Sequence, residues 1–216
     1  MSENFFVPFD IYLENSRRFK KKRSERWAQR IYSQFLPKKF RILEIGSGPG
    51  FLIRELSRLS PSNVYFSMDI HFPALQWQML CSPPPGSPPI CCIQNSPYSF
   101  PFRNNQFDLI ISEDCLHCLD FMPFVTEIIR ILKPGGSALL MDIDIDKFIY
   151  KLIRIKKIFF NFFKFASLNP FEKAFIHAVE QGYKKENLQE HLKQIKNIRY
   201  LLDTINNCHY IEIVKL

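Results

Sequence analysis

Glycine is scarce in this sequence, and the glycines that do occur are grouped. The 216 residues contain seven glycines, and five of them lie in two short stretches, at positions 46, 48 and 50 and at positions 135 and 136. Glycine adopts backbone conformations that other residues avoid. We therefore expect these two stretches to form turns with special backbone geometry.

Long apolar runs are also missing. No apolar run is long enough to span a bilayer. The N-terminal residues include Glu3 and Asp10 and lack the apolar run of a signal peptide. Six cysteines without a secretory context favour a reduced, cytoplasmic protein. Cys115 and Cys118 form one C-x-x-C pair, but no second pair stands at ligand spacing, so neither a metal site nor redox chemistry is expected.

Charge is unevenly distributed along the chain. Residues 17–41 hold eleven Lys and Arg against one acid, a net charge of +10, and residues 147–164 hold six against none. The intervening residues 42–146 hold five basic and eleven acidic residues, a net charge of −6. The basic segments are therefore the parts expected to meet an anionic surface or partner.

The first glycine group follows a short apolar run. Ile42 to Ile45 precede Gly46, Gly48 and Gly50, and a helical pattern begins directly afterwards. This order predicts a buried strand, a tight turn and a helix. The glycines of the turn would let a ligand approach the backbone closely. The unpaired N–H groups at the start of the helix would point toward that ligand.

The spacing of this turn distinguishes between ligands. A dinucleotide-binding turn has the pattern G-x-G-x-x-G, whereas this chain has E-x-G-x-G-x-G, from Glu44 to Gly50. The pattern resembles the first motif of the class I methyltransferases that use S-adenosylmethionine (SAM). That resemblance implies that Glu44 helps to place the methionine end of SAM and that Gly46, Ser47, Gly48 and Gly50 contact the cofactor.

The next two predicted strands would complete the cofactor site. The strand over 64–68 ends at Asp69, whose carboxylate is suited to accept hydrogen bonds from both ribose hydroxyls. The resemblance places the ribose-binding acid here and Ile70 near the adenine. Family members have an adenine-binding Asp after the next strand, and this chain departs from them by having Asn95 and Ser96 there. A hydroxyl or amide accepts the same bond more weakly.

Two further motifs strengthen the resemblance. The strand over 107–112 is similar to the family's second motif and leads into Glu113 and His117, at the end of the sheet where ligands bind in open α/β folds. We expect Glu113 to contact the cofactor, and His117 is the best candidate for a general base, with a structural role as the alternative. The stretch 127–136, which ends in Lys-Pro-Gly-Gly, matches the third motif and would terminate a helix before the fifth strand.

The predicted fold is therefore α/β: a Rossmann-like class I methyltransferase with a mostly parallel seven-stranded sheet, helices on both faces and a C-terminal antiparallel hairpin. We expect one domain over 1–216. It would comprise a basic helical cap (1–40), a SAM-binding core (41–146), a basic and aromatic helical insertion (147–182), and a helix with the hairpin (183–216).

Asp142, Asp144 and Asp146 alternate at the end of the fifth strand and would share one face. Like charges so close need counter-charges or a metal. A solvated strand end near lysines is preferred to a metal site, because methyl transfer from SAM has no inherent need for a metal.

Residues 147–165 have the pattern of a basic amphipathic helix with a wide aromatic face. Three interpretations stay open: a helix packed on the core, a lid over an apolar substrate, or a helix lying on an anionic membrane as a peripheral attachment. Its charges argue against a membrane-spanning segment.

The sequence as a whole indicates a SAM-dependent methyltransferase whose acceptor is a small apolar molecule such as a quinone, a lipid or a hydrophobic metabolite. One alternative is methylation of RNA, motivated by the basic segment 17–41, although no Asn-Pro-Pro-Tyr-like motif follows the fourth strand. The other is a non-catalytic scaffold with the same fold. The oligomeric state is open.

Overall fold

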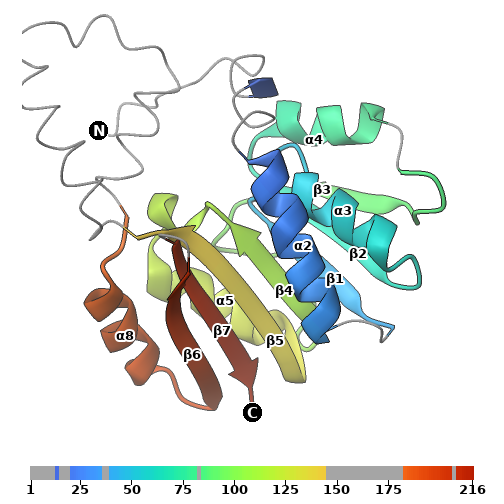
Figure 1. Cartoon of the computed structure of the whole chain (residues 1–216). Coiled ribbons are helices and arrows are strands. Elements are labelled where there is room, and N and C mark those ends of the chain that lie inside the picture. The colour runs from blue at the N-terminus through green and yellow to red at the C-terminus, as the bar shows by residue number, and fades with distance from the viewer. Residues whose placement is uncertain (1–12, 15–19, 36–38, 82–83, 145–181, 206–207) are drawn as a thin grey trace, which may run out of the picture.

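The computed structural model describes residues 13–14, 20–35, 39–81, 84–144, 182–205 and 208–216. These residues form a seven-stranded sheet with helices on both faces (Figure 1). The strands are β1 (Arg41–Ile45), β2 (Val64–Asp69), β3 (Ile90–Gln94), β4 (Phe107–Glu113), β5 (Leu132–Ile143), β6 (Ile198–Ile205) and β7 (Cys208–Lys215). The helices are α2 (Lys21–Phe35), α3 (Phe51–Leu59), α4 (Phe72–Leu80), η1 (Leu116–Cys118, a 3-10 turn), α5 (Phe121–Ile131) and α8 (Lys185–Gln194).

The strand order confirms the predicted fold. The sheet runs β3-β2-β1-β4-β5-β7-β6, in which β1 to β5 pair in parallel and β7 is antiparallel to both β5 and β6. Because the order reverses at β1, with β2 on one side and β4 on the other, the carboxyl ends of these strands border the crevice in which open α/β folds bind ligands.

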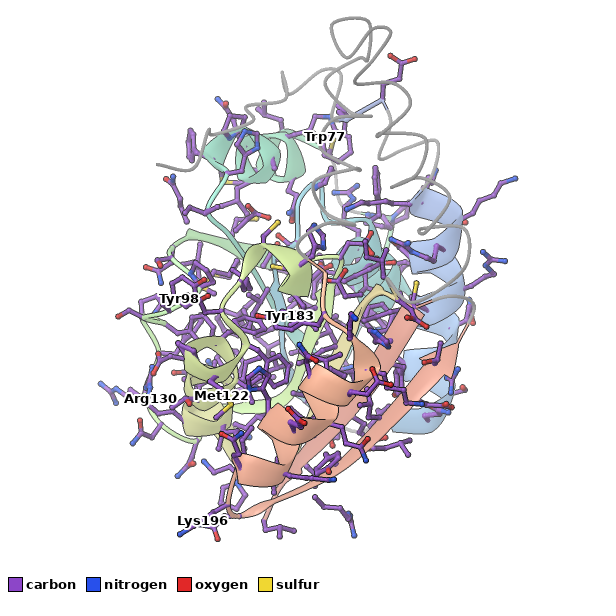
Figure 2. The ribbon with its side chains drawn as sticks, turned by 90° about the vertical axis from the view of Figure 1, so that its left-hand side faces the viewer. Trp77, Tyr98, Met122, Arg130, Tyr183 and Lys196 are labelled. Carbon is purple, nitrogen blue, oxygen red and sulfur yellow. The ribbon has the colours of Figure 1, made fainter. Side chains whose placement is uncertain are left out.

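The core consists of two apolar layers, one on each face of the sheet. One layer joins α2 and α3 to the sheet through buried side chains that include Trp27, Ile31 and Leu56. The other joins α5 and α8 to the opposite face and includes Phe124 and Leu192. Trp77 on α4 and Lys196, which follows α8, lie at opposite ends of the molecule (Figure 2).

The Lys-Pro-Gly-Gly stretch differs in detail from the prediction. It lies within the bounds of β5 rather than before the strand, and the pairing jumps from Phe107↔Leu132 to Leu109↔Ser137. The extra β5 residues form a bulge. A side chain at Gly136 would lie 2.9 Å from the Lys133 carbonyl oxygen, so only glycine fits at this close approach of backbone to backbone.

Several predictions fall on residues that are not described. The insertion over 147–182 lies almost wholly in the undescribed segment 145–181, so its helical character, its possible contact with membranes and its boundaries stay predictions. Of the predicted N-terminal helices, α2 is present, and most residues before it are not described. Among the described residues, no helix is both long and apolar enough to cross a membrane.

Candidate functional site

The residues selected from the sequence gather at one edge of the sheet. Glu44 lies in β1, the glycine turn follows it, Asp69 and Glu113 end β2 and β4, and His117 lies in η1 just beyond β4. This is the edge at the carboxyl ends of the parallel strands, as predicted.

The glycine turn has the backbone geometry that its sequence predicts. Gly46, Gly48 and Gly50 all have positive φ, at 68°, 51° and 72°. The amides of Gly46 and Ser47 donate hydrogen bonds to the Met68 carbonyl, at 2.9 and 3.2 Å, which ties the turn to β2. Positive φ at three alternating positions disfavours residues with a Cβ, so the loop conformation depends on all three glycines.

A buried amide on α4 braces this turn. The Gln78 Nε2 atom donates to the Gly48 carbonyl at 2.6 Å and to the Ser47 hydroxyl at 3.0 Å. The Ser67 hydroxyl donates to Gln78 Oε1 at 2.9 Å. Since Gln78 is only 5% exposed, it serves as an internal support for the turn. Sequence reasoning missed it, because the stretch 73–80 contains two amides, Gln76 and Gln78, and the sequence does not indicate which one is buried.

Asp69 holds the turn from the other side. Its Oδ2 atom accepts the Gly48 N–H at 2.7 Å, and its Oδ1 atom accepts the His71 N–H at 2.8 Å. A carboxylate has about four lone-pair positions, so these two bonds fix its orientation and leave acceptor capacity for a ligand.

Glu44 is a buried acid, with 2% of its surface exposed. Its Oε2 atom accepts the Ile53 N–H, in the first turn of α3, at 3.2 Å. Burial raises the pKa of Glu44 well above its usual range, and the nearby Glu113 raises it further. Within the described part of the chain no ion pair involves Glu44, so a positively charged ligand group would be a favourable partner for it.

Helix α2 occupies both oxygens of Glu113. Arg23 Nε donates to Oε1 at 2.8 Å, and the Ser24 hydroxyl donates to Oε2 at 2.6 Å. Asp114 accepts from Arg23 and forms an ion pair with Lys20 at 3.3 Å. Burial and the Asp114 charge raise the pKa of Glu113, and Arg23 and Ser24 oppose that shift. Glu113 thus attaches the N-terminal helix to the end of β4, and its contact with a cofactor stays a prediction.

His117 is paired with Asp142 of β5. Its Nδ1 atom lies 2.9 and 3.1 Å from the two Asp142 oxygens, and its backbone N–H donates to Oδ2 at 2.9 Å. Burial by itself would lower the pKa of His117, but the Asp142 carboxylate raises it to about 10. At neutral pH the ring is therefore protonated, with no lone pair for taking up a proton.

The prediction of a solvated strand end after β5 is wrong for the two aspartates that are described. Asp142 and Asp144 are 4% and 5% exposed. Asp144 lies 3.6 Å from Nε2 of the buried His209, which comes from β7. The neighbouring strand β7 thus brings in a histidine partner that is distant in sequence. Asp146 lies outside the described residues.

The residues expected near the adenine lie at the surface. Ile70 is 66% exposed and Ser96 is exposed as well. The Asn95 side chain donates to the carbonyls of Ser96 and Ser99, at 2.9 and 2.6 Å, and thereby shapes the turn after β3. Their contact with a ligand stays a prediction.

Tyr183, just before α8, links the C-terminal part of the chain to the segment that follows η1 (Figure 2). Its hydroxyl donates to the Leu119 carbonyl at 2.6 Å and accepts the Phe121 N–H at 3.0 Å.

Among the described residues no group of three or more His, Cys, Asp or Glu side chains could hold a metal ion.

Comparison with known protein families gives one matching family. The sequence model described as "Methyltransferase domain" matches residues 43–140, which run from within β1 through β2, β3 and β4 into β5.

Among curated proteins, the chain is 29% identical over 104 residues to the phthiotriol/phenolphthiotriol dimycocerosates methyltransferase of Mycobacterium leprae. It is 27% identical over 104 residues to the enzyme of that name, numbered 1, of Mycobacterium ulcerans. Each match covers 48% of this chain, and the chain spans only 37% of the length of these two relatives.

Solved structures share the fold over almost the whole chain. A protein of Methanococcus maripaludis that is provisionally assigned as a SAM-dependent methyltransferase superposes with a TM-score of 0.69 at 22% identity. The superposition covers 100% of this chain and 97% of that one. The plantazolicin methyltransferase BpumL, solved with S-adenosylhomocysteine (SAH), superposes with a TM-score of 0.74 at 12% identity, covering 95% and 89%.

The packing of Gly50 against Gln78 yields a prediction for stability. A Cβ at Gly50 would lie 2.5 Å from the Gln78 amide, whereas a Cβ at Gly86, which has a similar φ of +77°, meets nothing within 4 Å. Both Gly→Ala changes cost about 1–2 kcal/mol of backbone strain. Gly50→Ala should cost roughly 1–3 kcal/mol more because of overpacking. Urea unfolding of the two variants measures the difference.

The double variant Gly50→Ala/Gln78→Ala is the matching control. It should be less destabilised than the sum of the Gly50→Ala and Gln78→Ala single variants, because Gln78→Ala removes the atoms that the new methyl group meets. Equal destabilisation by Gly50→Ala and Gly86→Ala would contradict the close packing of Gln78 against Gly50.

The His117–Asp142 pair yields a prediction for pH. The pKa of His117 is about 10 in the folded protein and about 6.5 in an unfolded chain. Because the folded state binds this proton more tightly, the stabilisation is complete below about pH 6.5 and is lost as the pH rises through about 10. Urea unfolding from about pH 6.5 to about pH 10 should therefore show a smaller decline in Asp142→Asn than in the unchanged protein. Parallel declines would contradict the pairing.

Proposed function

We propose that this chain, whose residues 43–140 form a methyltransferase domain of the SAM-dependent class I family, transfers a methyl group from SAM to a small apolar acceptor. The observation that carries the proposal is the shared location of the glycine turn, Glu44 and Asp69 at one edge of the sheet. The fold and the family match support the same reaction class.

The residues at this edge suit SAM chemically. The methionine end of SAM carries positive charge, and Glu44 is a buried acid whose pKa burial raises and which forms no ion pair among the described residues. The Gly46–Gly50 turn carries few side-chain atoms, because three of its five residues are glycine. Asp69 has acceptor capacity remaining for ribose hydroxyls. In this proposal Ile70, Asn95 and Ser96 border the adenine.

SAM, when bound, supplies an activated methyl group, and the contribution of the chain is to align the reactants and exclude water. The bracing of the turn by Gln78 and Asp69 supports this role, because a fixed turn loses less conformational entropy when a ligand binds. Glu113 acts in this proposal through Arg23 and Ser24, by holding α2 against the site.

The acceptor is proposed to be apolar on two grounds. The curated relatives are named for phthiotriol and phenolphthiotriol dimycocerosates, and residues 147–165 have a wide aromatic face in sequence. The same segment is basic, which supports peripheral attachment to an anionic membrane as part of this proposal.

RNA is the second candidate acceptor. It is favoured by the basic segment 17–41, because basic segments bind phosphate backbones.

Cofactor binding is tested by calorimetric titration with SAM and SAH, with NAD as the control ligand. We expect binding of SAM and SAH but not of NAD. Asp69→Asn should weaken SAM binding by about 10- to 100-fold, the range expected when a charged hydrogen-bond acceptor is lost. Asp203→Asn, a matched change on the exposed edge strand β6, should leave the affinity unchanged. Failure of both SAM and SAH to bind would refute the enzymatic proposal.

The acceptor class is tested with SAM carrying a radiolabelled methyl group. The protein is incubated in parallel with an organic-solvent extract of cells and with purified total RNA, and label is counted in each product. We expect label in the organic extract, at least about tenfold above the Asp69→Asn variant. Label in RNA instead would support the second candidate, and binding of SAM without any transfer would favour the scaffold alternative.

A further inference from the structure

The His117–Asp142 pair has a geometry that the cofactor site does not require. The imidazole comes from η1, after β4, and the carboxylate comes from β5. Asp142 contacts both the ring and the backbone N–H of His117, so the position and the orientation of the ring are fixed together.

Asp142 is fully engaged by hydrogen-bond donors. Its Oδ1 atom accepts the Ile143 N–H at 2.7 Å and lies 2.9 Å from His117 Nδ1, and its Oδ2 atom accepts the His117 N–H. Three donors thus converge on the two oxygens of this buried carboxylate. It therefore holds a proton on Nδ1 and leaves Nε2 as the second polar atom of the ring.

The charges that face His117 from other elements favour a protonated ring. Asp142 faces it from β5, Asp114 faces it from the end of β4, and the Cys118 thiol is a hydrogen-bonding neighbour within η1. The ring side chain is 14% exposed, so solvent screens these interactions only partly. Together they raise the pKa of His117 to about 10.

The pair adjoins the glycine turn. Cys115, which precedes η1, packs against Gly46 so closely that a Cβ there would lie 2.5 Å from its sulfur atom. The Cys115 thiol is also influenced electrostatically by both Asp69 and Asp142. Asp142, which holds His117, and the proposed ribose-binding acid Asp69 therefore both lie near the same thiol, which places the pair next to the proposed cofactor site.

We propose that His117 binds an ionised oxygen of the methyl acceptor by donating a ring N–H, so that the acceptor is an apolar molecule ending in a carboxylate or an acidic hydroxyl. This rests on the proposed function and names its substrate class. Asp142 is the positioning residue, because it acts through His117. The role differs from the general base expected from the sequence, since a protonated ring cannot accept a proton.

The chemistry balances without a base. The acceptor reaches the site already deprotonated, and its oxyanion attacks the methyl carbon. A carbon–oxygen bond forms as the carbon–sulfur bond breaks, and the electron pair of the broken bond stays on sulfur as a neutral thioether. No proton is transferred, and the charged histidine remains unchanged throughout.

The test compares two probes that share an apolar chain and differ in the head group, decanoate and decanol. Each is titrated into the full chain in the presence of saturating SAH. Near pH 8 we expect decanoate to bind at least about tenfold more tightly than decanol, as a charged hydrogen bond predicts. His117→Gln should remove this preference. Arg199→Gln, which removes one positive charge from the exposed edge strand β6, should keep it.

Asp142→Asn provides a readout that a purely structural role would not produce. Without the carboxylate, burial should hold the pKa of the ring at or below its ordinary value of about 6.5. The variant should therefore lose the preference for decanoate at about pH 8 and regain it only below about pH 6.5, whereas the unchanged protein prefers decanoate across this range. Circular dichroism checks that each variant is folded, so loss of binding through unfolding is recognised.

Two results would overturn the inference: equal binding of decanoate and decanol to the unchanged protein near pH 8, or a preference that survives His117→Gln. The SAH titration separates this inference from the proposed function. Binding of SAH without a carboxylate preference refutes the role of His117 alone, and absence of SAH binding refutes the methyltransferase proposal itself.

Discussion

Compensation of negative charge at the carboxyl ends of the parallel strands is the constraint on which this site depends. Six acids lie at this edge: Glu44, Asp69, Glu113, Asp114, Asp142 and Asp144. Several of them are buried, and a buried carboxylate is costly unless it is paired or hydrogen-bonded. Arg23 of α2, His117 of η1 and His209 of β7 pair with four of these acids, so the acids bring elements that are distant in sequence together at the site.

These partners explain the arrangement of the surrounding elements. Arg23 and Ser24 bring α2 to the end of β4, and the backbone amides of Gly48 and His71 orient Asp69. Asp142 holds His117. Glu44 differs from the other acids. Among the described residues it accepts a hydrogen bond from the Ile53 N–H but forms no ion pair, so a cationic ligand group would be favourable beside it.

Much of the fold was predictable because its signals are local. Short apolar runs bounded by glycine, proline and asparagine marked the strands, and the turn from Gly46 to Gly50 required positive φ that only glycine adopts readily. The resemblance to class I methyltransferases supplied the mostly parallel seven-stranded sheet with its C-terminal hairpin, which local patterns do not specify. The Lys-Pro-Gly-Gly stretch was predicted to precede the fifth strand but lies within it, because a bulge within a strand and a turn before a strand have the same sequence pattern.

The sequence by itself determined the strands, the glycine turn and the acids that end β1, β2 and β4, since each depends on residues close together in the chain. Only the tertiary structure decided how those acids are paired. Gln78 braces a turn about thirty residues before it, Arg23 reaches Glu113 across 90 residues, and Asp142 converts His117 from a candidate base into a protonated ring. A pKa depends on charges and burial in three dimensions, so no local pattern reveals it.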